Sequence, residues 1–125
     1  LDGKQQEKIL VGREPRGEKP SEVIARRATD LPGLCGADLS KDQQAKLLDT
    51  MRRMLACFRA DDVNATMKAI EDRKIVEQLF VSCYGGKYDI GEDKVWDVWQ
   101  IEGPNMVWYF RGHPHVHTWV NIVKG

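Results

Sequence analysis

Apolar residues recur at three- and four-residue steps within residues 41–58. This spacing places them along one face of a helix, which we expect to pack against the core. The members of this apolar stripe are Leu47, Leu48, Met51, Met54, Leu55 and Phe58. Ser40, with Gln43 three residues later, matches a capping box and predicts where the helix begins.

Weaker helical patterns lie on either side of this segment. Residues 62–72 follow Asp61, a suitable cap, and they place Val63, Met67 and Ile70 on one face. Two shorter helices are predicted at 3–10 and 21–28, and a linker with glycine and proline at 12–20 separates them.

After residue 74 the pattern changes to short runs rich in valine and aromatic residues, bounded by Gly, Pro, Asn and Asp, which indicates strands. The predicted strands are 75–84, 94–102, 106–111 and 115–123. Gly103-Pro104 and Gly112-His113 are short enough to join antiparallel hairpins. We therefore predict one α+β domain, residues 1–125, in which N-terminal helices (about 1–74) pack on a C-terminal antiparallel β-meander (about 75–125).

The composition excludes several classes of protein. With 125 residues, of which 42% are hydrophobic, the chain fits a single domain with its own core. Its 19 basic residues balance its 19 acidic residues, so we expect no nucleic-acid partner. The longest apolar runs are far shorter than the roughly 20 residues of a membrane-spanning helix, so we expect no membrane insertion. Because the chain begins at Leu1 and not at Met, we expect it to be a piece of a longer protein.

All three histidines of the chain lie within five residues, at His113, His115 and His117. Alternate residues of a strand share a face and lie about 6.7 Å apart, so His115 and His117 can both reach one metal ion. His113 can join them only if Pro114 bends the backbone. Imidazole donors are compatible with both copper and zinc, and the sequence does not choose between the two metals. The alternative is that the histidines are ordinary strand residues, hydrogen-bonded to the backbone or to Thr118.

The hairpin register decides which residues lie beside the histidines. If both turns have two residues, Asp97 lies opposite Phe110, and Phe110 lies opposite His115. Asp97 would then be a third ligand or would orient an imidazole. One face of the sheet would hold Asp97, Trp99, Ile101, Met106, Trp108, Phe110, His115, His117 and Trp119, and the other Val98, Val107, Val116, Val120 and Ile122. We expect the apolar stripe to pack on this valine face.

The cysteines, Cys35, Cys57 and Cys83, are an odd set without zinc-finger spacing, so we expect no structural zinc knot. Cys57 lies beside the apolar stripe and Cys83 in a strand, which favours buried, inert thiols. The alternative, for an exported protein, is one disulfide from Cys35 to either of the others.

Several motifs follow one another in a distinctive order: L-D-G-K-Q, L-C-G-A-D-L-S-K-D-Q-Q-A-K-L-L, L-F-V-S-C-Y-G-G, W-Q-I-E-G-P and H-V-H-T. This series, over residues 1–121, resembles the family called domain of unknown function 3500, and the I-E-G-P hairpin followed by the H-V-H strand is its distinctive part. Gln100, where arginine is frequent, and the ending T-W-V-N-I-V depart from the family pattern. The resemblance implies one α+β unit, often part of exported bacterial proteins, with no established activity. It favours a periplasmic or secreted location and marks His115 and His117 as positions of interest.

These observations lead to three hypotheses of function. The first is a small metal-binding domain, associated with redox chemistry, that holds copper or zinc through His115 and His117, with Asp97 or His113 as the third ligand. The second is a non-enzymatic module whose aromatic sheet face docks against another domain of the same protein. The third is a metal-assisted hydrolase or oxygenase, which needs a general base, and Asp97 or Glu102 is the candidate.

Overall fold

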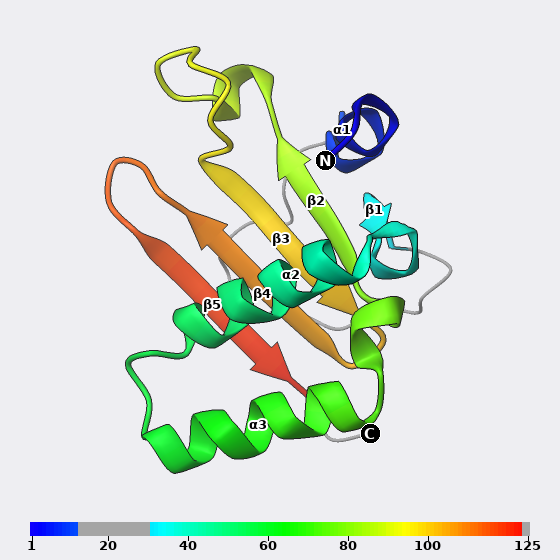
Figure 1. Cartoon of the computed structure of the whole chain (residues 1–125). Helices are drawn as coiled ribbons and strands as arrows, with labels where there is room; N and C mark the ends of the chain where they lie inside the picture. The colour runs from blue at the N-terminus through cyan, green and yellow to red at the C-terminus, as the bar shows by residue number, and fades with distance from the viewer. Residues whose placement is uncertain (13–30, 124–125) are drawn as a thin grey trace.

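The computed structural model describes residues 1–12 and 31–123 and has an α+β fold (Figure 1). Its elements in the described residues are α1 (Gly3–Ile9), β1 (Leu34–Cys35), α2 (Lys41–Met54), α3 (Ala60–Asp72), β2 (Phe80–Tyr84), β3 (Val98–Gly103), β4 (Met106–Arg111) and β5 (His117–Ile122). The five strands form one antiparallel sheet in the order β1-β2-β3-β4-β5. The predicted fold class is therefore confirmed.

Local signals predicted the start of α2 but not every helix boundary. Ser40 Oγ accepts a hydrogen bond from Gln43 N–H at 3.2 Å, and Gln43 Oε1 accepts one from Ser40 N–H at 2.9 Å, which confirms the capping box. However, α2 ends at Met54 and not at residue 58, and the cap of α3 is Arg59 and not Asp61. The helix predicted at 21–28 and nearly all of the linker predicted at 12–20 lie outside the described residues.

The first predicted strand begins later than expected. Lys74 adopts a left-handed conformation with φ of 52°, and Ile75–Gln78 then forms a 3-10 turn. The strand β2 starts only at Phe80. Two further 3-10 turns are Gly36–Asp38 and Gly86–Tyr88.

Helices α2 and α3 cover one face of the sheet (Figure 1). The sheet residues in this core are Ile101, Met106 and Trp108, and Trp108 is completely buried. The prediction that the helices pack on the valine face is wrong. A tryptophan buries far more apolar surface than a valine does, so covering the aromatic face removes more apolar area from water. The helices thus cover the β3 and β4 part of the predicted aromatic face, whereas Trp119 packs on the opposite face of the sheet.

The register of the two hairpins differs from the predicted one. Gly103 pairs with Met106, so the first turn is Pro104-Asn105. The second connection spans residues 112–116, and Trp108 pairs with Val120 where His117 was predicted. This shift of three residues, an odd number, exchanges the two faces of β5.

The face of the sheet opposite the helices carries a smaller core. Tyr84, Val98 and Tyr109 are buried there, and Trp119 packs against them. Tyr84 Oη donates a hydrogen bond to Gln100 Oε1 at 2.5 Å. His117 lies on this face because it pairs with Arg111, which pairs in turn with Val98. No helix in the described ranges is long and apolar enough to cross a membrane.

Candidate functional site

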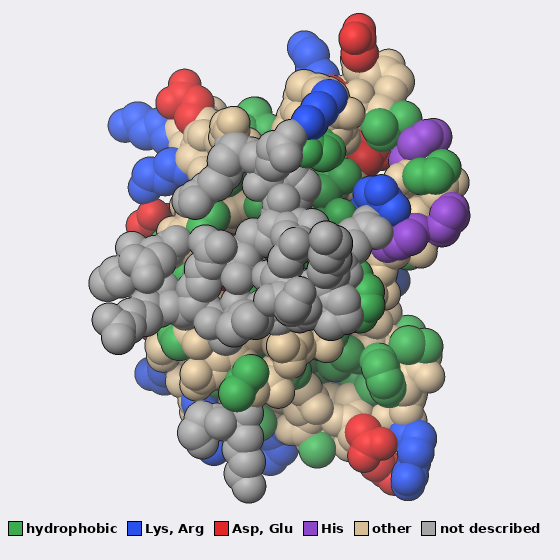
Figure 2. Space-filling view, turned by 180° about the vertical axis from the view of Figure 1, so that it is seen from behind, with side chains coloured by type: hydrophobic (Ala, Val, Ile, Leu, Met, Phe, Trp, Pro, Cys, Tyr) green, Lys and Arg blue, Asp and Glu red, His purple; other side chains and the backbone are tan. Residues whose placement is uncertain are grey.

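The histidine segment lies at one end of the sheet, between β4 and β5. His117 is the first residue of β5 and pairs with Arg111, and His115 lies in the connection 112–116. The centres of the His115 and His117 rings are 4.4 Å apart, and their planes meet at 31°. His113 and His115 are exposed and His117 is half-buried, so the histidines gather at the surface (Figure 2). The structure brings together the two histidines that the sequence predicted as a pair.

The carboxylate of Asp97 does not complete this pair. Gly112 N–H donates to the Asp97 backbone carbonyl at 2.8 Å, but the Asp97 carboxylate accepts from Ile90 N–H at 2.7 Å. Among the described residues, no set of three His, Cys, Asp or Glu side chains that includes a histidine has its ligand atoms within 4.8 Å of one another. The predicted set of two histidines with Asp97 or with His113 is therefore not assembled. The predicted register placed Asp97 and His115 on either side of Phe110. In the observed register Phe110 pairs with Trp99 and Thr118 instead.

Three aspartates converge in the loop between β2 and β3. The ligand atoms of Asp89, Asp93 and Asp97 all lie within 4.8 Å of one another. Each carboxylate accepts one hydrogen bond from the backbone of the same loop. The donors are the N–H groups of Lys94 (3.2 Å), Val95 (2.9 Å) and Ile90 (2.7 Å), respectively. The second oxygen of Asp89, Oδ1, is buried without a hydrogen-bond partner.

This acidic loop was not among the predictions from the sequence. Its one sequence signal is an aspartate at every fourth position, 89, 93 and 97, and that spacing is also common on exposed loops. Carboxylate oxygens suit hard cations such as Ca²⁺, whereas imidazoles suit copper and zinc. The structure therefore divides the predicted ligands between two groups of different chemistry. Both groups lie at the same end of the sheet (Figure 1).

Glu102, the other candidate base, is remote from the histidine pair. It is 1% exposed and lies on β3, four residues beyond Val98. Val98 belongs to the row of Arg111 and His117, and four residues of strand span roughly 13 Å. Glu102 therefore does not serve as a general base beside the histidines.

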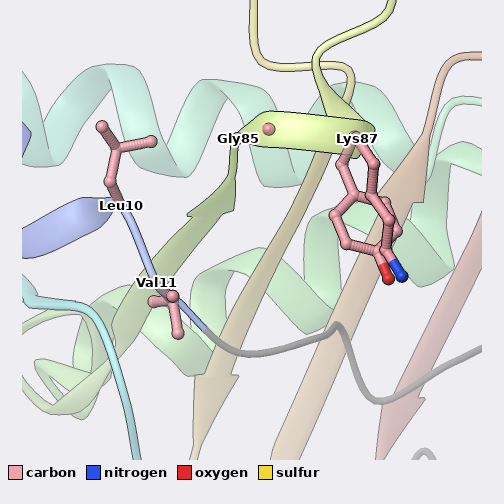
Figure 3. Close-up of a pocket in the computed structure, with 7 residues that line it drawn as sticks. Leu10, Val11, Gly85 and Lys87 are labelled. Carbon is pink, nitrogen blue, oxygen red and sulfur yellow. The ribbon is translucent and has the colours of Figure 1, made fainter.

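A cavity of about 540 Å³ opens where residues 10–12 lie beside residues 85–88. Leu10 and Val11 lie on one side of it and Lys87 on the other (Figure 3). The Lys87 ammonium is 5.1 Å from the centre of the Tyr88 ring, which is a cation–π contact. Among the described residues that line this cavity there is no acidic or histidine side chain, so these residues provide no carboxylate or imidazole ligand for a metal.

The three cysteines are free thiols. Cys83 is buried in β2, and this burial raises the pKa of its thiol from 9.0 to about 12. The Cys35 thiol donates to the Glu77 carbonyl at 3.4 Å. Cys57 is exposed, so the prediction that it is buried is wrong. The helix ends at Met54, and the chain after it leaves the core before Cys57 is reached.

Comparisons with known proteins identify no relative of this chain. No family model, no curated protein and no solved structure matches the chain. The resemblance to the domain of unknown function 3500 family stays a prediction. The function is therefore argued from the residues of the site.

Proposed function

We propose that the chain is a small metal-binding domain and that His115 and His117 bind a copper or zinc ion. The observation that supports this is the distance of 4.4 Å between the two ring centres. A metal–nitrogen bond of about 2.0 Å puts each ring centre roughly 3 Å from the ion, so two imidazoles on one ion have centres no more than about 6 Å apart. The observed distance lies within this limit.

Two protein ligands leave coordination positions for other groups. A structural zinc site has four protein ligands, whereas sites with fewer keep positions for water or for a group from another molecule. The exposure of His115 leaves room for such a group at the surface. A two-histidine site is thus suited to an exchangeable ion or to a ligand from another domain of the same protein.

The acidic loop is a second candidate for the same function, with a different ion. Three carboxylates within 4.8 Å of one another repel each other, and no ion pair with a lysine or arginine of the described residues offsets this. The buried, unpartnered Oδ1 of Asp89 is an oxygen that a cation would satisfy. This arrangement favours a calcium ion over copper or zinc.

Calorimetric titration of the metal-free chain with Cu²⁺, Zn²⁺ and Ca²⁺ tests both candidates. The double variant His115→Ala/His117→Ala should lose more than about tenfold in copper and zinc affinity, because no other imidazole replaces the pair. His113→Ala is the matched control, since it removes an exposed histidine of the same turn, and it should keep the affinity of the wild type.

Asp93→Asn separates the two candidate sites. It removes the charge of an exposed carboxylate of the acidic loop and leaves both histidines in place. Copper and zinc binding should not change, and any calcium binding should weaken. Equal copper and zinc affinities in the wild type and in the double histidine variant would rule out the histidine site. Calcium binding that Asp93→Asn abolishes would then assign the function to the acidic loop.

A further inference from the structure

A separate apolar cavity lies between α1, α2 and β2. Its volume is about 390 Å³, within the range of roughly 300 to 1,000 Å³ that is usual for small-molecule sites. Its apolar lining consists of Leu1, Ile9, Leu34, Leu39, Leu47, Val81 and Trp96. Its lining includes neither histidine of the pair and none of the three aspartates of the acidic loop, although Trp96 directly precedes Asp97.

Polar contacts hold α1 in place as one wall of this cavity, and Gln43, which also lines the cavity, takes part in them. The side-chain amides of Gln5 and Gln43 bond each other in both directions, at 3.1 and 3.0 Å. Gln5 Nε2 also donates to the Asp38 carbonyl at 2.9 Å, and Lys8 forms an ion pair with the Asp38 carboxylate at 2.9 Å. The helix is thus fixed at its distance from α2 by side chains that do not fill the space between them.

The polar residues of the cavity lie along α2 and differ in what they can offer a ligand. The Gln43 amide is already paired with Gln5, and its oxygen also accepts from Ser40 N–H. Thr50 Oγ1 donates to the Lys46 carbonyl at 2.9 Å. Within the described part of the chain, the Lys46 ammonium, in contrast, has no hydrogen bond or ion pair, and no acidic residue lines the cavity. Lys46 therefore places a positive charge at the exposed side of an apolar space.

We propose that this cavity binds a small amphipathic anion, with an apolar body among the leucines and a carboxylate at Lys46. The apolar lining favours a hydrocarbon or aromatic body, since burying each methylene group removes apolar surface from water. The charge selects the head group, because a cationic head would meet Lys46 with no acidic residue to offset it. A medium-chain fatty acid has this chemistry.

The test is binding of decanoate and of decanol to the whole chain, measured by two-dimensional amide NMR in the presence of EDTA. Decanoate should bind saturably, with shifts of the Trp96 indole N–H and of the amides at 43–50. Of the four tryptophans, Trp96 is the one that lines the cavity. Decanol, which has the same body without the charge, should bind about fivefold more weakly, the size expected for an exposed ion pair.

Two variants and their controls assign the binding to this cavity. Lys46→Gln should lower decanoate affinity about fivefold and leave decanol affinity unchanged, whereas Lys68→Gln on α3 should change neither. Thr50→Leu adds bulk inside the cavity and should weaken both probes, whereas Thr66→Leu, which faces a different groove beside α3, should weaken neither.

Any of four results would overturn the proposal. The first is the absence of saturable decanoate binding, and the second is equal affinity for decanoate and decanol. The third is a Lys46→Gln variant with wild-type decanoate affinity. The fourth is a set of shifts confined to residues outside the cavity. Because no metal ligand takes part, none of these results bears on the histidine site.

Discussion

The carbonyl oxygen of Val76 lies 1.8 Å from the point that a β-carbon on Gly36 would occupy. The Gly36 N–H also donates to the Leu79 carbonyl at 2.7 Å. The 3-10 turns Gly36–Asp38 and Ile75–Gln78 therefore pack backbone against backbone. Real β-carbons essentially never come within 3.0 Å of such an atom, so any side chain at this position must push the two turns apart.

Gly36→Ala should lower the free energy of unfolding by more than about 2 kcal/mol, because a carbonyl in a turn cannot move aside as a flexible side chain can. Gly3→Ala is the control. Nothing lies within 4 Å of its added β-carbon, and alanine favours the helix, so stability should stay equal or rise by up to about 1 kcal/mol. Urea unfolding followed by circular dichroism measures both. A Gly36→Ala variant as stable as the wild type would contradict the close packing.

Leu55→Ala should cost about 2 to 5 kcal/mol of unfolding free energy, because Leu55 is 6% exposed and its loss leaves a cavity under α2. Phe58→Ala changes a residue of the same predicted stripe that is 61% exposed. Its cost should stay within about 0.5 kcal/mol. The same urea experiment compares the two. Similar costs for both variants would mean that the stripe continues into the core past the end of α2.

The helices could be predicted because their signals are local. Ser40 and Gln43 lie three residues apart, and the same two residues form the cap in the structure. Phe58 could not be placed in this way. It continues the spacing of the stripe, but the helix has already ended at Met54, and the spacing alone carries no stop signal.

The sheet register could be predicted only in part. Proline favours the first central position of a turn and asparagine tolerates the second, so Pro104-Asn105 is the better turn, and this signal was present in the sequence. The connection 112–116 has five residues, and no comparable residue preference predicts its length. This length decides on which face of the sheet His117 lies. The site depends on this connection and on the loop of Asp89. The closeness of His115 and His117 follows from their spacing in the sequence, whereas the predicted third ligand, Asp97, lies with Asp89 and Asp93.

The thiols should differ sharply in reactivity. Cys57 is exposed and should react fastest with a thiol reagent on the native chain, Cys35 more slowly, and Cys83 only on unfolding. Titration of the denatured, unreduced chain should give three thiols. Mass spectrometry of the labelled peptides identifies the order. A count of one thiol would show a disulfide and would contradict the structure.

Stability should fall as the pH rises above about 9, and Cys83 should account for part of this fall. Its pKa is raised from 9.0 to about 12 in the folded protein by burial. Between these values the unfolded chain loses the thiol proton and the folded chain keeps it, so ionisation favours unfolding by up to about 1.4 kcal/mol per pH unit. Below about pH 9 the thiol is protonated in both states and contributes no pH dependence.

Cys83→Ala isolates this effect. Near neutral pH the variant should have a lower free energy of unfolding than the wild type by a constant amount, because the packing of the side chain is lost. Between about pH 9 and pH 11 this difference should shrink, because only the wild type has a buried thiol that loses its proton on unfolding, and this loss favours the unfolded state. Cys57→Ala is the control, because it removes a thiol that is exposed to solvent in the folded protein. Urea unfolding at a series of pH values measures both. A Cys83→Ala deficit that stays constant over this range would mean that solvent reaches the Cys83 thiol in the folded protein.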